Sequence, residues 1–347
     1  MRYSIKYLVT LALSLFLVAC GKQPEIITLT GKTMGTTYHI KYIDDGKISQ
    51  KAEQAHEQIE VILKKVNDQM STYIPTSELS RFNQNTQINQ AIEISPELGN
   101  VIAESLRLNK LTDGALDVTV GPLVNLWGFG PEKRLDQQPS QQQLNERLAI
   151  VGIDKLKLNH NGDKYSLEKN IPQLYVDLSS IAKGYGVDQV ADYLETIGTQ
   201  NYLVEIGGEI RAKGKNAEHK DWQIAIEQPN FDGSRSVQKI VGLKDLGMAT
   251  SGDYRNYFEQ NGVRYNHEID PKTGYPVQHK LASITVLHPS AMTADGLSTG
   301  LFVLGEEKAL AIAEQQGIAI YMIIKTEKGF ETKMSSKFTA LFMEQNK

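Results

Sequence analysis

The stretch that decides the fold reads Val176-Asp177-Leu178-Ser179-Ser180-Ile181-Ala182-Lys183-Gly184-Tyr185-Gly186-Val187-Asp188. The apolar run before Asp177 predicts a strand that ends there, and apolar residues then recur at helical spacing from Val187 to a stop at Gly198. The two serines between them offer hydroxyls that can cap the helix. A strand-to-helix junction of this kind aims free backbone N–H groups and the positive end of the helix dipole at one place, which suits a phosphate.

Three residues inside this helix bear on the same hypothesis. Lys183 adds a positive charge one turn in, while Gly184 and Gly186 are poor helix formers that are tolerated where another group must approach the backbone closely. An ordinary capped helix packed on a sheet explains the stretch equally well. A second segment, far along the chain, favours the phosphate site.

That second segment begins with a predicted strand, Leu281 to Leu287, followed by a helix that Pro289-Ser290 can start and Gly305 can stop. Asp295 and Thr299 are four residues apart on this helix, so a carboxylate and a hydroxyl project from one face. Oxygen ligands without His or Cys suit Mg²⁺ rather than Zn²⁺. A backbone carbonyl near Ser180 is a candidate third ligand. The alternative is that Asp295 is an ordinary polar helix residue.

The N-terminus has the pattern of an export signal. Arg2 and Lys6 precede an apolar run from Leu8 to Ala19, which is too short for a permanent membrane span. The sequence Leu-Val-Ala-Cys that ends at Cys20 resembles the bacterial lipobox, and Cys20 is the only cysteine of the chain. We therefore expect a signal peptide at 1–19, a lipidated tether at 20–25 and a single domain at 26–347. The protein would be anchored by lipid to the inner or outer membrane and face the periplasm.

Charge and strand pattern narrow the class of protein. The chain has 37 Lys+Arg and 41 Asp+Glu residues without long runs of one sign, which argues against nucleic-acid binding. The region from Tyr202 to Leu287 reads as strands joined by polar turns, with predicted helices on either side. This favours an α+β fold, with antiparallel sheets wrapped by helices in two closely joined lobes and the site in the cleft, over a doubly wound parallel sheet.

The remaining candidate positions are weaker when taken singly. Met34 beside a small turn, and Tyr73 after a helix, are side chains that can pad an aromatic ring but are more often core or surface residues. His267 and Asp270 flank a short extended segment and can face one crevice, although a lone histidine more often has a structural role.

Taken together and in order, these pieces resemble the ApbE family of FAD:protein FMN transferases over nearly the whole mature region. The segments that carry the resemblance are Met34-Gly35-Thr36, Met70-Ser71-Thr72-Tyr73, Thr112-Asp113-Gly114-Ala115-Leu116-Asp117, Val176-Asp177-Leu178, Lys183-Gly184-Tyr185, Ser251-Gly252-Asp253-Tyr254, His267-Glu268-Ile269-Asp270-Pro271-Lys272-Thr273-Gly274 and Ala294-Asp295-Gly296.

The resemblance implies transfer of the FMN half of FAD to a threonine or serine hydroxyl of an acceptor flavoprotein, with release of AMP. It also implies acceptors among the subunits of membrane redox pumps. Phosphoryl-group transfer needs positioning and charge stabilisation, which Mg²⁺ on Asp295 and Thr299, with Ser180, would provide. His267 is then the candidate general base for the acceptor hydroxyl, with Asp270 orienting it.

The same interpretation assigns the cofactor contacts. Lys183 and the helix start would hold phosphate or ribose, and Asp177 would accept hydrogen bonds from the dinucleotide or order the waters of the metal. The residues expected to line the flavin or adenine, or to make close backbone and carboxylate contacts, are Met34, Tyr73, Ile269, Ala115, Leu116 and Asp117. Two other functions remain open: a lipoprotein that carries FAD without chemistry, and a Mg²⁺-dependent FAD pyrophosphatase.

Overall fold

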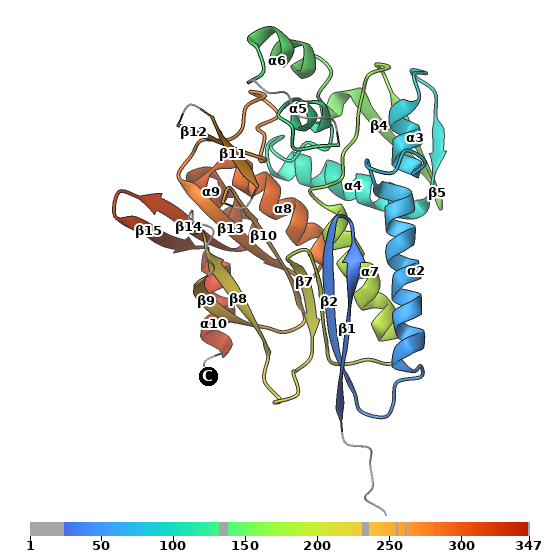
Figure 1. The fold of residues 1–347 in the computed structure, drawn as a ribbon, viewed down its shortest axis with the longest axis vertical. Helices are drawn as coiled ribbons and strands as arrows, with labels where there is room; N and C mark the ends of the chain where they lie inside the picture. Colours follow the sequence, from blue (N-terminus) through green and yellow to red (C-terminus); the bar gives the residue numbers. More distant parts are fainter. Residues whose placement is uncertain (1–23, 132–137, 231–235, 255, 261, 346–347) are drawn as a thin grey trace, which may run out of the picture.

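The computed structural model describes residues 24–131, 138–230, 236–254, 256–260 and 262–345 (Figure 1). The predicted signal peptide, Cys20 and most of the tether therefore lie outside the described residues, and those predictions stay untested. Within the described ranges, no helix combines the length and the apolar character needed to span a membrane.

An eight-stranded antiparallel sheet forms the centre of the molecule, in the order β1-β2-β6-β7-β10-β13-β14-β15. Its strands are β1 (Glu25–Thr33), β2 (Thr36–Asp44), β6 (Tyr202–Ile206), β7 (Glu209–Lys213), β10 (Leu246–Gly252), β13 (Leu281–His288), β14 (Ala319–Thr326) and β15 (Gly329–Met334). The predicted α+β class is confirmed, because every strand pairing in this sheet is antiparallel and a doubly wound sheet would be parallel.

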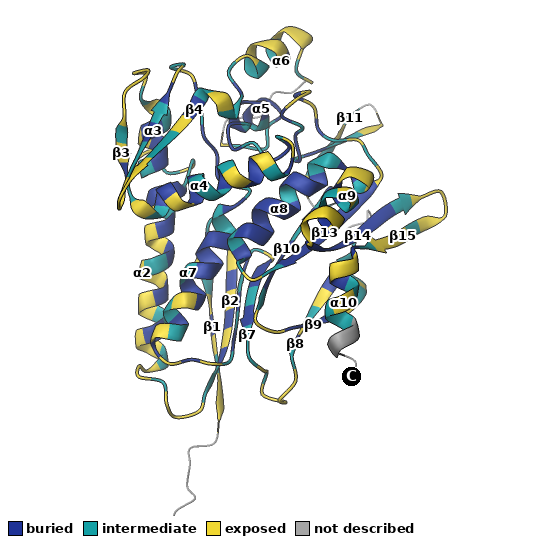
Figure 2. Ribbon diagram, turned by 180° about the vertical axis from the view of Figure 1, so that it is seen from behind, coloured by how far each residue is buried: buried dark blue, intermediate teal, exposed yellow. Residues whose placement is uncertain are grey.

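The two faces of this sheet are covered differently. Figure 2 shows the helical face, on which the long helices lie in front of the strands: α2 (Ala52–Met70), α4 (Pro96–Leu111), α7 (Ala182–Thr196), α8 (Ala291–Leu304) and α9 (Glu306–Gln316). The opposite face packs against a separate two-stranded sheet, β8 (Trp222–Gln228) with β9 (Ser236–Leu243), and against α10 (Ser336–Gln345).

Smaller elements complete the fold. They are α3 (Glu78–Gln84), β3 (Ile92–Ile94), α5 (Gly121–Leu126), α6 (Gln141–Leu148), the short 3₁₀ helix Ile153–Lys155, β4 (Leu156–Asn161), β5 (Lys164–Lys169), β11 (Tyr257–Gln260) and β12 (Val263–Asn266). Of these, α5 and α6 lie above α4 in Figure 1. The strands form a β3-β5-β4 sheet and a β11-β12 hairpin, which the sequence interpretation did not include.

Capping side chains and a terminal glycine determine the ends of two of the long helices. The hydroxyl of Ser95 accepts a hydrogen bond from the backbone N–H of Leu98, and Pro96 occupies the first turn. Ser290 caps α8 in the same way, and Gly305 ends that helix at a φ of 78°. The boundaries of α8 match the prediction, because a cap acts within one turn of its helix.

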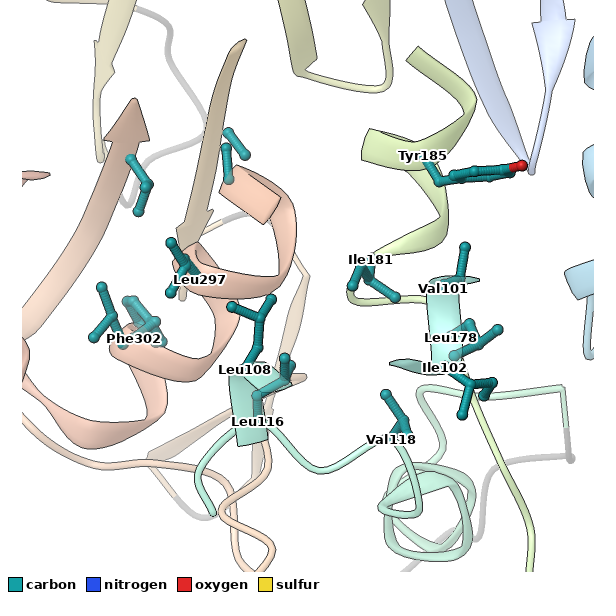
Figure 3. Close-up of a cluster of buried hydrophobic side chains, with 14 of the residues drawn as sticks. Val101, Ile102, Leu108, Leu116, Val118, Leu178, Ile181, Tyr185, Leu297 and Phe302 are labelled. Carbon is teal, nitrogen blue, oxygen red and sulfur yellow. The ribbon is translucent and has the colours of Figure 1, made fainter. Parts of the chain in front are cut away.

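The largest core cluster brings the loop after α4 against α8 (Figure 3). A Cβ built on Gly296 of α8 would lie 2.5 Å from Leu108 and 3.3 Å from Leu116. A side chain at this position would require Leu108 to shift, so the glycine lets the segment 112–117 pack beside the helix that carries Asp295.

The predicted strand before Asp177 is wrong. Val176 belongs to none of the described sheets, and its backbone bonds to a side chain instead. The Asn83 amide accepts from the Val176 N–H at 2.8 Å and donates to the Val176 carbonyl at 2.8 Å. The N–H of Asp177 then donates to the carbonyl of Val118 at 2.7 Å. One asparagine thus replaces a neighbouring strand, which satisfies the buried backbone without a sheet ladder.

Candidate functional site

A cavity of about 620 Å³ collects almost all of the predicted site residues. Its walls come from α7, α8, β7, β8, β10 and the loops that join the smaller elements. The predicted residues that line it are Met34, Tyr73, Ala115, Leu116, Asp117, Asp177, Ser180, Lys183, His267, Ile269, Asp295 and Thr299. The volume lies within the range of small-molecule sites in enzymes.

Helices α7 and α8 meet at a glycine. A Cβ on Gly184 would lie 2.3 Å from the carbonyl oxygen of Ala291 and 2.8 Å from the Cβ of Asp295, so no larger residue fits. The backbone N–H of Gly184 donates to Oδ2 of Asp295 at 2.9 Å. The first turn of α7 therefore binds a carboxylate of the protein itself. The N–H of Gly184 is therefore not free for a phosphate, as the prediction required, because α8 supplies an anion to the same place.

The reverse contact caps α8. Asp188 of α7 accepts hydrogen bonds from the N–H of Ala291 and of Met292, both at 3.0 Å, and from the hydroxyl of Ser290 at 2.7 Å. Arg211 adds an ion pair at 3.1 Å. Each helix thus supplies a carboxylate to the N-terminus of the other, and the two bonds fix the position of α8, and so of Asp295, relative to α7.

Lys183 lies between acidic residues at the centre of the cavity wall. Its Nζ is 2.7 Å from Oε2 of Glu209 and 3.7 Å from Oδ1 of Asp295. Burial lowers the pKa of Lys183, but the two carboxylates outweigh it and raise that pKa on balance. Lys183 lines the cavity, so its predicted contact with phosphate or ribose stays a prediction, and in this structure its charge is paired with protein carboxylates.

The acidic side chains around Lys183 are held at raised pKa values. Burial raises the pKa of Asp295, which is 3% exposed, against the opposing effects of Lys183 and the Gly184 N–H. Burial likewise raises the pKa of Glu209. Glu268 also lines the cavity, and burial raises its pKa to about 8, with further upward contributions from Asp295 and Asp253. Lys183 is the only lysine or arginine among the described residues that line the cavity, and it faces several carboxyl groups, so these residues favour an additional cation.

The two ring nitrogens of His267 have different neighbours. Its Nδ1 lies 3.2 Å from the carbonyl oxygen of Asn256, which accepts only if Nδ1 carries the proton. Its Nε2 lies 3.6 Å from Oε1 of Glu268. Burial lowers the pKa of His267 to about 4. The imidazole is therefore neutral at physiological pH, and Nε2 can accept a proton.

The predicted partnership of His267 with Asp270 is wrong. Oδ1 of Asp270 accepts from the N–H of Lys272 at 2.8 Å, and Oδ2 accepts from the hydroxyl of Thr273 at 3.2 Å. These bonds close the turn at Pro271-Lys272-Thr273-Gly274, a composition typical of turns. No described contact joins Asp270 to His267, and Asp270 is not among the cavity-lining residues. The Asn256 carbonyl orients the histidine instead.

The hydroxyls near Asp295 form a small network with β10. Ser251 Oγ lies 3.0 Å from Ser298 Oγ and 3.3 Å from Thr299 Oγ1. Ser298 donates to the backbone carbonyl of Asp295 at 2.9 Å. Thr299 lines the cavity whereas Ser298 does not, so Thr299 is the hydroxyl available to a ligand beside Asp295.

Asp177 and Asp117, on loops that line the cavity, accept hydrogen bonds within local turns. Oδ1 of Asp177 accepts from the N–H and the hydroxyl of Ser179, the former at 2.9 Å and the latter at 2.5 Å. The serines therefore do not cap α7, whose N-cap is Ile181 without a side-chain bond. Asp117 accepts from the N–H of Thr119 at 2.7 Å, and burial raises its pKa. Both bonds of Asp177 to Ser179 use Oδ1, so its Oδ2 is available for other contacts, whereas Asp117 also bonds to the backbone of Ile153.

Met34 confirms the close approach that the glycines of α7 indicated. A Cβ on Gly186 would lie 2.9 Å from the Cε of Met34, which itself has a positive φ of 49°. This places an apolar side chain on the cavity wall next to α7. Tyr73 is at the outer rim, with 64% of its surface exposed.

Sequence reasoning missed Glu209, Glu268 and Ser251 as site residues. Glu209 follows Gly207-Gly208, and both glycines have positive φ values, of 62° and 109°. That tight turn between β6 and β7 directs Glu209 to Lys183, and the glycine pair was its only signal. Glu268 lay inside a quoted motif, but its position beside Lys183 depends on the tertiary structure.

The chain matches known proteins over nearly its whole length. A profile of the ApbE family matches residues 34–322. A Haemophilus influenzae protein named FAD:protein FMN transferase is 64% identical, with 98% of this chain and 99% of the relative aligned. A protein of the same name from Vibrio cholerae is 55% identical over 96% of this chain and 97% of the relative.

Solved structures agree with the sequence relatives. The flavin transferase ApbE from Vibrio cholerae superposes with a TM-score of 0.85 at 53% identity, covering 91% of this chain and 99% of that one. The flavinyl transferase ApbE from Pseudomonas stutzeri, in its apo form, gives a TM-score of 0.83 at 42% identity, with 92% and 98% covered.

Proposed function

The chain belongs to the ApbE family, and we propose that it is an FAD:protein FMN transferase. It transfers the FMN moiety of FAD to a threonine or serine hydroxyl of an acceptor flavoprotein and releases AMP. The observation that carries the proposal is the single cavity in which Asp177, Asp295 and His267 meet from distant parts of the chain. This supports the assignment because pyrophosphate cleavage needs charge stabilisation and a proton acceptor in one place.

The residues present fit Mg²⁺. Asp295 is buried and uses one carboxylate oxygen for the Gly184 N–H, while its other oxygen is 3.7 Å from Lys183, beyond hydrogen-bonding distance. Thr299 and Ser180 line the same cavity and add a hydroxyl and a backbone carbonyl. These hard oxygen donors leave room for water and phosphate ligands. When bound, the cation would supply Lewis-acid stabilisation of charge on the pyrophosphate.

The remaining chemistry belongs to side chains of this protein. The acceptor hydroxyl attacks the phosphorus of the FMN half of FAD; a new O–P bond forms, and the bond to the bridging oxygen breaks. AMP leaves with that oxygen. Lys183, paired with Glu209, opposes the rise that burial causes in the pKa of Asp295, and the Gly184 N–H fixes the orientation of that carboxylate.

His267 takes the proton of the acceptor hydroxyl. The Asn256 carbonyl holds the proton on Nδ1, so the basic Nε2 is the acceptor atom. Because burial lowers the pKa of His267 to about 4, the base is neutral throughout the physiological range. Glu268, 3.6 Å from Nε2 and with its pKa raised to about 8, is mostly protonated at pH 7 and so does not compete as a permanent anion.

One assay separates this function from its two alternatives. The protein is incubated with FAD, Mg²⁺ and a flavoprotein subunit of a membrane redox pump purified without flavin. Covalent fluorescence on the acceptor band, with one AMP released for each flavin attached, supports the transferase. Free FMN together with AMP identifies an FAD pyrophosphatase, and tightly bound intact FAD without AMP identifies a carrier.

We also propose that the protein acts at the periplasmic face of a membrane, on acceptors exposed on the same side. The lipobox-like segment before Cys20 supports this. Cys20→Ser should yield a protein that is released to the soluble fraction or retained with its leader uncleaved, as read by membrane fractionation and mass spectrometry. Membrane attachment of the variant after leader cleavage would refute the lipid anchor.

A further inference from the structure

Strand β8 is an edge strand whose edge opens on the active-site cavity. Among the described strands it pairs only with β9, in a two-stranded sheet separate from the central one (Figure 1). Its buried side chains, including Ile226, pack against the central sheet, and the strand is held at its start by the indole N–H of Trp222, which donates to the Lys213 carbonyl at 3.0 Å. The sheet formed by β8 and β9 therefore packs on the central sheet by one face, and the edge of β8 opposite β9 pairs with none of the described strands.

The residues that line the cavity identify which edge faces it. Ile224, Ala225, Ile226 and Glu227 all contribute to the cavity wall, and no described residue of β9 does. Successive side chains of a strand point to opposite faces. Here Ile224 and Ile226 point to the sheet, and Ala225 is exposed on the other side. A cavity that touches all of them meets the edge of β8, where backbone N–H and C=O groups are presented.

We infer that the acceptor protein docks by adding an extended segment to the free edge of β8, with its hydroxyl-bearing residue pointing into the cavity. This inference rests on the proposed function, which requires an acceptor polypeptide to reach the cavity. An added strand would lie about 4.8 Å from β8, and every second side chain would point to the same face as Ile224 and Ile226. That face leads to Glu209 and Met248 on the cavity wall.

Hydrogen bonds to the backbone of β8 can supply affinity for an acceptor segment without requiring a long specific sequence in it. Main-chain hydrogen bonds of an added strand do not depend on side-chain identity, whereas the alternate side chains that enter the cavity do. Strand addition at β8 would thus select an acceptor segment that is extended, carries a small residue with a hydroxyl group, and is not held in the acceptor's own secondary structure. A hydroxyl at the tip of a helix or buried in a sheet would not meet these conditions.

Amide hydrogen exchange tests this directly. The Cys20→Ser protein is measured alone, with FAD, and with an excess of a flavin-free redox-pump subunit whose acceptor threonine is changed to valine, read residue by residue. We expect alternate amides within 222–228 to exchange at least about tenfold more slowly with the subunit and not with FAD alone. Strand β15, an edge strand of the central sheet with no cavity-lining residue, is the internal control.

Unchanged exchange in β8, with a subunit whose unaltered form does receive FMN, would overturn the docking and leave the transferase intact. Failure of the unaltered subunit to receive FMN would instead refute the proposed function.

A pair of proline variants provides a second test of docking at β8. Neighbouring residues of β8 direct their N–H groups alternately to β9 and to the free edge, so Ile224→Pro and Ala225→Pro differ in which side they affect. The variant that keeps the parental melting temperature has lost an edge N–H, and its KM for the acceptor subunit should rise about tenfold or more. A parental KM in that variant would contradict the inference. If both variants unfold, the exchange result alone decides.

Discussion

Helices α7 and α8 exchange carboxylates, and the two contacts differ in how completely the protein satisfies them. Asp188 receives two backbone N–H groups, a serine hydroxyl and an arginine, which use both of its oxygens. Asp295 receives one backbone N–H and has a lysine at 3.7 Å. Both acids sit at a helix N-terminus, but only Asp295 lines the cavity. A carboxylate with all of its donors supplied by the protein serves the fold, while one left partly unsatisfied in a buried site can bind a ligand.

The largest effect is expected from Asp295→Ala. Removing the only carboxylate of the proposed Mg²⁺ site should lower Mg²⁺-dependent AMP release about a thousandfold. The unfolding free energy should stay near that of the parent protein, because the lost Gly184 contact is offset by removal of a desolvated charge and Lys183 keeps Glu209. AMP assays and urea unfolding measure the two quantities. Undiminished turnover would remove Asp295 from the chemistry.

His267→Ala should slow transfer about 10²- to 10⁴-fold with little change in the affinity for FAD. The rate of flavin attachment in single-turnover experiments is compared with FAD binding measured by fluorescence quenching. In the parent protein the acidic limb of the rate profile should lie near pH 4 rather than 6.5, because burial lowers the pKa of this histidine. Equal losses in binding and rate would assign His267 a structural role.

Asp188→Asn tests the carboxylate whose two oxygens both accept hydrogen bonds from the protein. The substitution keeps the shape but removes the charge that meets Arg211 and the α8 N-terminus, and it should cost about 1–3 kcal/mol of stability. Transfer per folded molecule should fall far less than in Asp295→Ala, while the apparent Kd for Mg²⁺ should rise as Asp295 loses its fixed position. A loss of catalysis equal to that of Asp295→Ala, at parental stability, would show that the two carboxylates are not divided between fold and site.

The smallest effect is expected from Glu268→Gln, as a pH-dependent change in stability. The pKa of this carboxyl is about 8 in the folded protein and near 4.5 when unfolded, so its contribution to stability is full below pH 4.5 and is lost as the pH rises through 8. The variant should therefore gain stability over the parent at pH 8 and gain less at pH 5. Thermal melts without metal measure this, and an equal difference at both pH values would contradict it.

The sequence predicted most of the residues that line the site, but it did not predict how they contact one another. Met34, Tyr73, Asp177, Asp295 and the others line one cavity as expected. The partners of these residues were predicted less accurately. Asp270 closes its own turn instead of contacting His267, and the pairing of Lys183 with Glu209 was not foreseen. Such errors arise because a motif fixes which groups are present, while the partner of each group comes from elsewhere in the fold.

The sequence by itself determined the local features: helix boundaries set by Ser95 and Ser290, the stop at Gly305, and the period-two strands from Tyr202 onward. Each depends on interactions within a few residues, so a short stretch contains all of the information. The tertiary structure alone decided that Gly184 meets Asp295 across 111 positions, that Asn83 replaces a strand beside Val176, and that the edge of β8 borders the cavity. Those contacts depend on how whole elements pack, because close packing selects one partner among many that the sequence permits.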